Sequence, residues 1–172
     1  MITLQNILVA TDFSEPAEAA LRYGRELARR FNASLHVLHV VDDIAASPGS
    51  VPGLPIDVGG LQTQLEEDAC ANLARLLPEF DRTALHAELE IAVSIWPGQA
   101  ILSYARDARI DLIIVGTHGR KGLTAFLLGS VAQQVARGAM CPVLTVRAHE
   151  RDFVHPDALQ TIEKAEREEV RH

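Results

Sequence analysis

Residues 111–131 have the sequence DLIIVGTHGRKGLTAFLLGSV, in which a short apolar run leads into a segment with four glycines. A short apolar run of this kind is typical of a strand that is buried on both faces of a parallel sheet. We therefore expect a strand over residues 111–116, a glycine-rich loop after it, and a helix from about Ser130 to Arg137. Serine is a favoured capping residue, so we expect Ser130 to cap this helix.

The rest of the chain repeats this alternation of apolar runs and amphipathic stretches. Apolar runs at 6–10, 34–41, 84–95 and 142–146 predict four more strands, and helical spacing predicts helices over 17–31, 61–77 and 97–108. The order βαβαβαβαβ predicts an α/β fold, an open parallel five-stranded sheet with helices on both faces, Rossmann-like in outline. Residues 1–147 would form this single domain.

Two segments fall outside the alternation. Residues 44–60 contain three prolines and four glycines, which predicts a flexible loop. Loops of this length are typical of a cover over a site or of disordered chain, and we favour the cover. Residues 148–172 are rich in charge and predict a C-terminal extension. We interpret it as a solvated segment, with a helix that binds a partner or bridges subunits as the alternative.

Composition narrows the classes of function. The chain has 172 residues, 48% of them apolar, and a formal net charge of −7, which fits one domain and disfavours sequence-independent nucleic-acid binding. The apolar runs are too short to cross a bilayer, so we expect no membrane insertion. Residues 1–6 lack the basic region of a signal peptide, which favours the cytoplasm. We interpret Cys70 and Cys141 as reduced, buried thiols.

The glycine-rich loop has the chemistry of an anion site. Glycines let backbone amides approach a phosphate, and the helix that starts near Ser130 presents unpaired N–H groups at its N-terminus. Arg120 and Lys121 add positive charge inside the loop. The chain nevertheless lacks the GxxxxGK[ST] pattern of a P-loop, and its first βα turn lacks the GxGxxG pattern of dinucleotide-binding folds.

The loop glycines have a distinctive spacing: Gly116, two residues, Gly119, nine residues, then Gly129 and Ser130. Together with ILVATDFS at 7–14, LHVVD at 38–42 and CPVLTVR at 141–147, this spacing resembles the ATP-binding subset of the universal stress protein family over residues 1–147. The resemblance implies the fold of the adenine nucleotide alpha hydrolases, with strand order 3-2-1-4-5. One turn departs from the family pattern, because Ile95-Trp96-Pro97 stands where Gly-x-Pro is usual. The shape of this turn stays open. We interpret Trp96 as a packing residue rather than as a stack on adenine, and leave it out of the site.

By position, the resemblance implies a site for ATP, or for ADP or AMP, with Mg²⁺ as the accompanying ion. The implied site residues are Ala10, Thr11, Asp12, Val40, Val115, Gly116, His118, Gly119, Arg120, Gly129, Ser130 and Val131. The resemblance also implies a homodimer that pairs the last strands, residues 143–146, or a larger assembly. An unidentified protein partner would receive the signal.

Several side chains allow two interpretations. Asp12 could be a helix cap alone, but its place at a strand end favours a contact with the ligand. His118 could be a general base, but a loop histidine that contacts the ligand through its backbone is the interpretation we favour. His36 and His39 are three residues apart in a strand and point to opposite faces, so they cannot hold one metal ion together.

Three functions fit these observations. The one we favour is a stress-response module that binds ATP, hydrolyses it slowly at most, and regulates a partner. The second is an ATPase or nucleotidyl-transfer enzyme of the same superfamily, which would need a positioned base, a metal-holding carboxylate and charge clamps. We see only scattered candidates for these groups and assign no catalytic residue. The third, an FMN carrier, is disfavoured because only 5% of the residues are aromatic.

Overall fold

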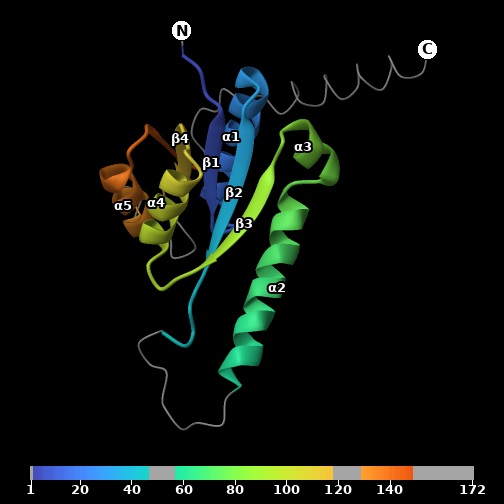
Figure 1. The fold of residues 1–172 in the computed structure, drawn as a ribbon, viewed down its shortest axis with the longest axis vertical. Coiled ribbons are helices and arrows are strands. Elements are labelled where there is room, and N and C mark those ends of the chain that lie inside the picture. The colour runs from blue at the N-terminus through green and yellow to red at the C-terminus, as the bar shows by residue number, and fades with distance from the viewer. Residues whose placement is uncertain (1, 47–56, 118–128, 149–172) are drawn as a thin grey trace, which may run out of the picture.

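The computed structural model describes residues 2–46, 57–117 and 129–148 of the chain (Figure 1). Its centre is one sheet of five parallel strands in the order β3-β2-β1-β4-β5. The strands are β1 (Asn6–Thr11), β2 (Ser34–Val41), β3 (Glu88–Val93), β4 (Leu112–Gly116) and β5 (Val143–Val146). The parallel five-stranded sheet that the sequence predicted and the strand order that the resemblance implied are confirmed.

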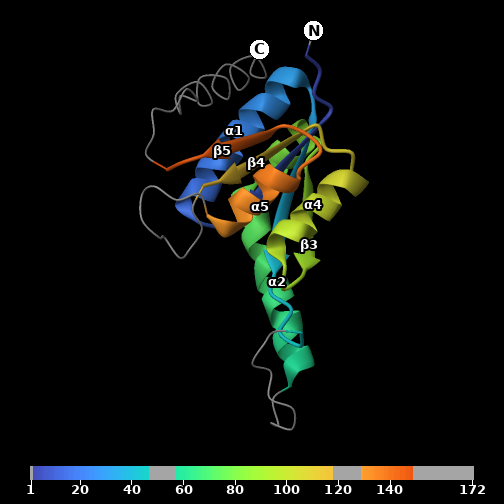
Figure 2. The ribbon, with the colours of Figure 1, turned by 90° about the vertical axis from the view of Figure 1, so that its left-hand side faces the viewer.

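Helices cover both faces of the sheet, as predicted (Figures 1 and 2). They are α1 (Glu15–Phe31), α2 (Val58–Leu76), α3 (Glu79–Ala84), α4 (Pro97–Asp107) and α5 (Ser130–Gly138). Helices α1 and α2 contact one face, and α4 and α5 contact the other. The N-terminal half of α2 extends past the sheet (Figure 1). In the part of the chain that the structure describes, no helix is both long and apolar enough to cross a bilayer.

The alternation of side chains along each strand divides the core into two clusters. In β4, Ile114 packs with α1, whereas Ile113 and Val115 pack with α4 and α5. Successive residues of a strand point to opposite faces, so a strand covered on both faces must be apolar at nearly every position. This requirement accounts for the apolar runs from which the sheet was predicted.

Helix α1 lies very close to the sheet at Gly24. A Cβ at this position would overlap Cγ2 of the buried Val9 and would lie 3.3 Å from Cδ1 of Leu35. Glycine therefore serves the packing of the helix against β1 and β2, despite its cost in helix propensity. The same helix ends at Asn32, which adopts the left-handed conformation (φ 52°), where the sequence predicted.

Two predicted boundaries were wrong. Helix α2 begins at Val58, because Asp57 caps it by accepting a hydrogen bond from the Gly60 amide at 2.9 Å. The predicted loop over 44–60 is therefore shorter, and its residues 47–56 lie outside the described part of the chain. The predicted strand over 84–95 begins only at Glu88, because helix α3 precedes it and ends at Ala84.

Helix α3 is held in place by an ion pair with α1, which the local sequence does not predict. Asp81, only 4% exposed, forms a salt bridge with Arg25 of α1, and Arg29 lies 3.7 Å from its other carboxylate oxygen. The same turn buries Leu85 in the core beneath α1 and α2. Leu85 is apolar, as a strand residue would be, but it lies in the turn that follows α3 and is buried there.

The two cysteines differ from expectation, whereas the two strand histidines match it. Cys70 is exposed and Cys141 half-buried, so the prediction of two buried thiols was wrong. His36 and His39 do face opposite sides of β2: Nδ1 of His36 lies 2.9 Å from the hydroxyl of Tyr104 in α4, whereas His39 faces the α1 side. Burial, together with the nearby Glu90 and Glu88, raises the pKa of Tyr104 to about 12.

We predict that Gly24→Ala lowers the free energy of unfolding by about 1–3 kcal/mol, because the added methyl group overlaps a buried valine. Urea denaturation followed by circular dichroism measures the change. The matched control is Gly59→Ala in the first turn of α2, where the nearest atom to the new methyl would be 3.6 Å away. This control should be neutral or stabilising by up to about 1 kcal/mol. Equal effects of the two substitutions would contradict the packing argument.

Candidate functional site

The carboxyl ends of β1, β2 and β4 lie side by side at one edge of the sheet. Ala10 of β1 is paired with Leu38 of β2 on one side and with Val115 of β4 on the other. The order β3-β2-β1-β4-β5 reverses direction at β1, so the crevice between β1 and β4 is the topological switch point of the sheet. Ligands of open α/β sheets bind at this position.

At the carboxyl ends of the strands, the face of the sheet beneath α4 and α5 carries small apolar side chains, which we call the apolar floor. Ala10, Val40, Ala92 and Val131 are partly buried against the cluster beneath α4 and α5, and Val115 is buried beside them. Ala92 was not in the predicted set, although the pairing of β2 with β3 places it opposite Val40. Side chains of this size leave room for a flat ring and can exclude water from one side of it.

The turn from β1 to α1 is held by its own side chains. The Phe13 amide donates to Oγ1 of the buried Thr11 at 3.1 Å, and the Ser14 amide donates to Oδ1 of Asp12 at 3.1 Å. The Ser14 hydroxyl donates to the same carboxylate oxygen. The sequence allowed Asp12 to be a helix cap, but Ser14 occupies the N-cap position of α1, and Asp12 stabilises the turn before it. Asp12 lies at the strand end where a ligand contact was predicted.

Phe13 has a φ of 62°, which is costly for a bulky residue with a Cβ. His39 holds it there from the end of β2. The two ring centroids are 4.4 Å apart, and Nδ1 of His39 lies 2.8 Å from the carbonyl oxygen of Thr11. A carbonyl only accepts hydrogen bonds, so Nδ1 must carry a proton and donate. Sequence reasoning missed this role of His39, although the register places it opposite Thr11.

Gly116, at the end of β4, faces the first turn of α1. A Cβ there would lie 2.8 Å from the carbonyl carbon of Pro16 and 2.9 Å from the amide nitrogen of Ala17. These atoms belong to the backbone and cannot move aside as a flexible side chain would. Glycine is therefore required for the approach of α1, a reason other than the approach of a phosphate proposed from sequence.

The residues after β4 bring the start of α5 to the same edge. Thr117, only 3% exposed, donates its amide to the carbonyl of Val146 in β5 at 2.8 Å. Its own carbonyl accepts from the Gly129 amide at 2.6 Å. The two ends of the segment 118–128 are thus joined by one hydrogen bond. The predicted site residues His118, Gly119 and Arg120 lie in that segment, outside the described residues.

Helix α5 begins at Ser130 with Gly129 at the N-cap position. Ser130 is the first helical residue, so the prediction that it caps the helix was wrong. The first hydrogen bond of the helix runs from the Gln133 amide to the Gly129 carbonyl at 2.9 Å. The amides of Ser130 and Val131 therefore have no acceptor within the helix and lie at the positive end of its dipole.

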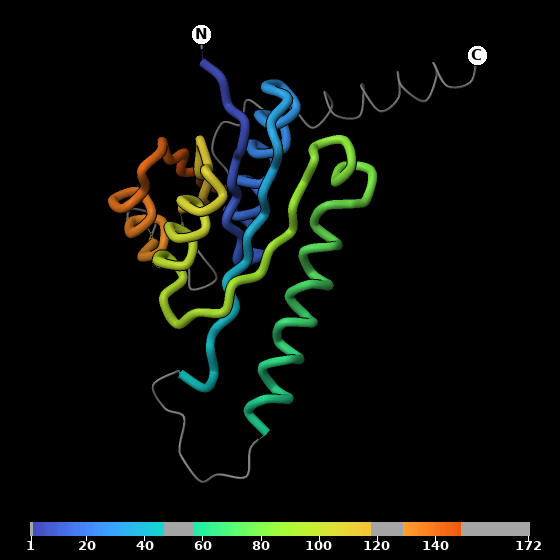
Figure 3. The backbone as a smooth tube through the Cα atoms, in the orientation of Figure 1, coloured from blue at the N-terminus to red at the C-terminus, as the bar shows by residue number. Residues whose placement is uncertain are grey.

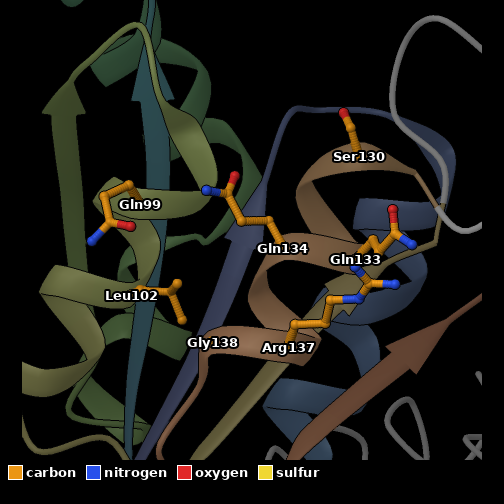
Figure 4. A pocket seen from close by; sticks show the side chains of 7 residues that line it. All are labelled: Gln99, Leu102, Ser130, Gln133, Gln134, Arg137 and Gly138. Carbon is orange, nitrogen blue, oxygen red and sulfur yellow. The ribbon is translucent and has the colours of Figure 1, made fainter.

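A shallow hollow of about 410 Å³ lies between α4 and α5 (Figure 4). Its lining is Gln99, Leu102, Ser130, Gln133, Gln134, Arg137 and Gly138. The Gln134 side chain is directed toward α4, whereas Arg137 and Gln133 lie on the other side of α5 (Figure 4). Ser130 is the one residue that the hollow shares with the predicted set. The described residues contain no group of three His, Cys, Asp or Glu side chains that could hold a metal ion.

A sequence model described as the universal stress protein family matches residues 3–147. The chain belongs to this family. A universal stress protein of Methanocaldococcus jannaschii is 30% identical in an alignment of 153 residues that covers 86% of this chain and 85% of that protein. The solved structure of universal stress protein UspA from Lactobacillus plantarum has a TM-score of 0.74 at 31% identity. It covers 86% of this chain and 100% of that chain.

Two further solved structures share the fold of this universal stress protein. One is a universal stress protein in complex with cAMP, with a TM-score of 0.57 at 24% identity, covering 86% of this chain and 99% of that chain. The other is from Archaeoglobus fulgidus in complex with dAMP, with a TM-score of 0.56 at 22% identity, covering 85% of this chain and 99% of that chain.

We predict that the two contacts of His39 stabilise the turn separately. His39→Phe keeps a ring beside Phe13 but leaves the Thr11 carbonyl without its donor, whereas His39→Asn keeps a donor and loses the ring. Each should lower the free energy of unfolding by about 1–2 kcal/mol. Amide exchange at Phe13 and Ser14 should speed up in both variants. Unchanged exchange at these two amides would mean that His39 does not hold the turn.

Proposed function

We propose that this universal stress protein binds an adenine nucleotide, ATP first of all and otherwise ADP or AMP, in the crevice between β1 and β4. The observation that carries the proposal is the meeting of two chemistries at one sheet edge. An apolar floor suited to a base lies beside the first amides of α5, which are suited to a phosphate. The hydrogen bond from Gly129 to Thr117 brings the two together.

The residues of this edge suggest how the nucleotide would lie. Val40 and Ala10 would contact the adenine, and Asp12 would face the ribose from the adjoining strand end. The Ser130 and Val131 amides and the Ser130 hydroxyl would donate to the phosphates. The Gly129 amide already donates to the Thr117 carbonyl, so it could donate to a phosphate, as predicted, only if its hydrogen bond to Thr117 opened. We assign His118, Gly119 and Arg120 to the ribose and phosphates on sequence grounds.

The two nucleotide complexes among the structural neighbours support this class of ligand. Both cAMP and dAMP carry adenine, a ribose-type sugar and one phosphate. Those two proteins share the fold at identities below 25%, so the number of phosphates bound here rests on the Gly129-Ser130 motif. We propose that Mg²⁺ accompanies a triphosphate and is held largely by phosphate oxygens and water, as is usual for this ion.

We propose a regulatory role in a stress response, with slow hydrolysis at most, in the cytoplasm where ATP is available. Asp12 accepts hydrogen bonds from the amide and hydroxyl of Ser14, which suits a positioning role better than that of a general base. An ATPase is the second candidate. Steady-state turnover above about 1 s⁻¹, the low end of ordinary enzyme rates, would favour it over the regulator.

We predict that Gly129→Asp weakens nucleotide binding at least about tenfold, because a carboxylate next to the phosphates repels them. Gly129 occupies the N-cap position, where Asp is a favoured residue, so the variant should fold normally. Calorimetry with ATP, ADP and AMP in the presence of Mg²⁺ measures the effect. The control Gln133→Asp places the same charge one turn further along α5, at an exposed position.

The outcomes of this titration separate two failures. Full affinity in Gly129→Asp would contradict the assignment of the phosphates to the start of α5. Absence of any heat with the unaltered protein at millimolar nucleotide would contradict nucleotide binding itself.

We also propose that two copies pair through β5 as a homodimer. In the described part of the chain, β3 and β5 have a neighbouring strand on one side only. Strand β3 carries Glu88 and Glu90, and charged side chains discourage pairing at an edge. Strand β5, with the sequence VLTV, carries no charge. An edge of this composition is suited to pairing with a second copy.

We predict that Thr145→Pro dissociates this dimer. The carbonyl of Pro142 accepts a hydrogen bond from Ile113 of β4 at 3.1 Å, and that of Val146 accepts one from Thr117, just after β4, at 2.8 Å. The alternate residues Val143 and Thr145 therefore direct their backbone groups to the open side. Proline at 145 removes one of those donors and leaves the bonds to β4 intact. Thr145→Val keeps the donor and should remain dimeric. Sedimentation velocity distinguishes the two, and a dimeric Thr145→Pro would exclude this edge.

A further inference from the structure

Trp96 is the only tryptophan of the chain, and 65% of its surface is exposed. The interpretation of Trp96 as a packing residue was therefore wrong. Tryptophan gains more from burial than most side chains, so a largely exposed indole is a candidate for contact with a ligand.

The backbone of Trp96 is fixed although its side chain is exposed. Its amide donates to the Ser94 hydroxyl at 3.0 Å, and its carbonyl accepts from the Ala100 amide at 3.0 Å in the first turn of α4. Pro97 follows directly and restricts the backbone of the residue before it. The indole is therefore carried by an ordered turn, which lowers the entropy lost when it contacts a ligand.

The position of this turn relates Trp96 to the apolar floor. The Ser94 amide donates to the carbonyl of Val41 at 3.0 Å, which places the turn beside the end of β2, next to Val40. Helix α4, which begins directly after Trp96, packs on the same face of the sheet as Ala10, Val40 and Ala92. Trp96 thus lies in the turn from β3 to α4, beside the end of β2 and on the face of the sheet that carries the apolar floor.

We propose that the Trp96 indole forms a wall of the base-binding part of this site and stacks on the adenine, opposite Val40 and Ala10. The inference rests on the proposed nucleotide binding and extends it, because it assigns selectivity for an aromatic base to a residue outside the predicted set. Stacking of a base on an aromatic side chain contributes about 1–3 kcal/mol, which corresponds to about 5- to 150-fold in affinity.

Because Trp96 is the only tryptophan, its intrinsic fluorescence reports directly on a ligand that contacts the indole. Addition of ATP with Mg²⁺ should quench the intrinsic fluorescence in a saturable way, with the dissociation constant that calorimetry gives. Inorganic tripolyphosphate, which has no base, should leave the emission unchanged. By calorimetry, Trp96→Ala should bind ATP about 5- to 150-fold more weakly, whereas Trp96→Phe, which keeps a ring, should lose less than about fivefold.

The control variant is Phe80→Ala, which removes an aromatic side chain that is 63% exposed on α3. It should bind ATP as the unaltered protein does. Both alanine variants remove exposed side chains, so their unfolding curves should stay close to that of the unaltered protein, and equal loss of affinity in both would overturn the inference.

The remaining outcomes separate this inference from the proposed function. If Trp96→Ala binds ATP as tightly as the unaltered protein, the inference fails while nucleotide binding stands. If Trp96→Ala changes only self-association, the indole is a protein contact and the inference fails as well. If the unaltered protein binds neither ATP nor AMP, the proposed function fails and this inference fails with it.

Discussion

The close approach of α1 to the end of β4 is the constraint on which the candidate site depends. Gly116 has no Cβ, and the backbone of Pro16 and Ala17 occupies the space that a Cβ would need. This contact fixes where α1 begins and therefore how sharply the chain must turn after β1. The turn meets that requirement with a left-handed Phe13, which His39 holds from the neighbouring strand. Backbone strain at a strand end is thus balanced by a ring contact and a hydrogen bond.

The sheet and most helices could be predicted from sequence because strands buried on both faces must be apolar, and because parallel strands need helical connections. The errors arose where tertiary contacts decide. Leu85 belongs to an apolar pattern that suits a strand, but the ion pair of Asp81 with Arg25 holds a helical turn before it. The start of α2 had a local signal in Asp57, which the abundance of glycine and proline around it obscured.

The candidate site was predictable where it depends on backbone geometry at strand ends. The apolar run and the glycines after it located the end of β4 and the start of α5, and the family resemblance, rather than local pattern, gave Val40, which lies on the face beneath α4. Roles that depend on contacts across the fold were not predictable. Local sequence gives no sign that Gly116 faces a helix, that the Gly129 amide is taken by Thr117, or that Trp96 is exposed.

Thr117 connects the end of β4 both to the edge strand β5 and to the start of α5. Its amide is bonded to Val146 in the edge strand, and its carbonyl is bonded to the Gly129 amide at the start of α5. A displacement of Gly129 therefore acts on a residue that is one hydrogen bond away from β5. Thr117 is buried, so breaking either bond would leave a backbone polar group unpaired in the interior, and the two bonds together fix the start of α5 relative to β5.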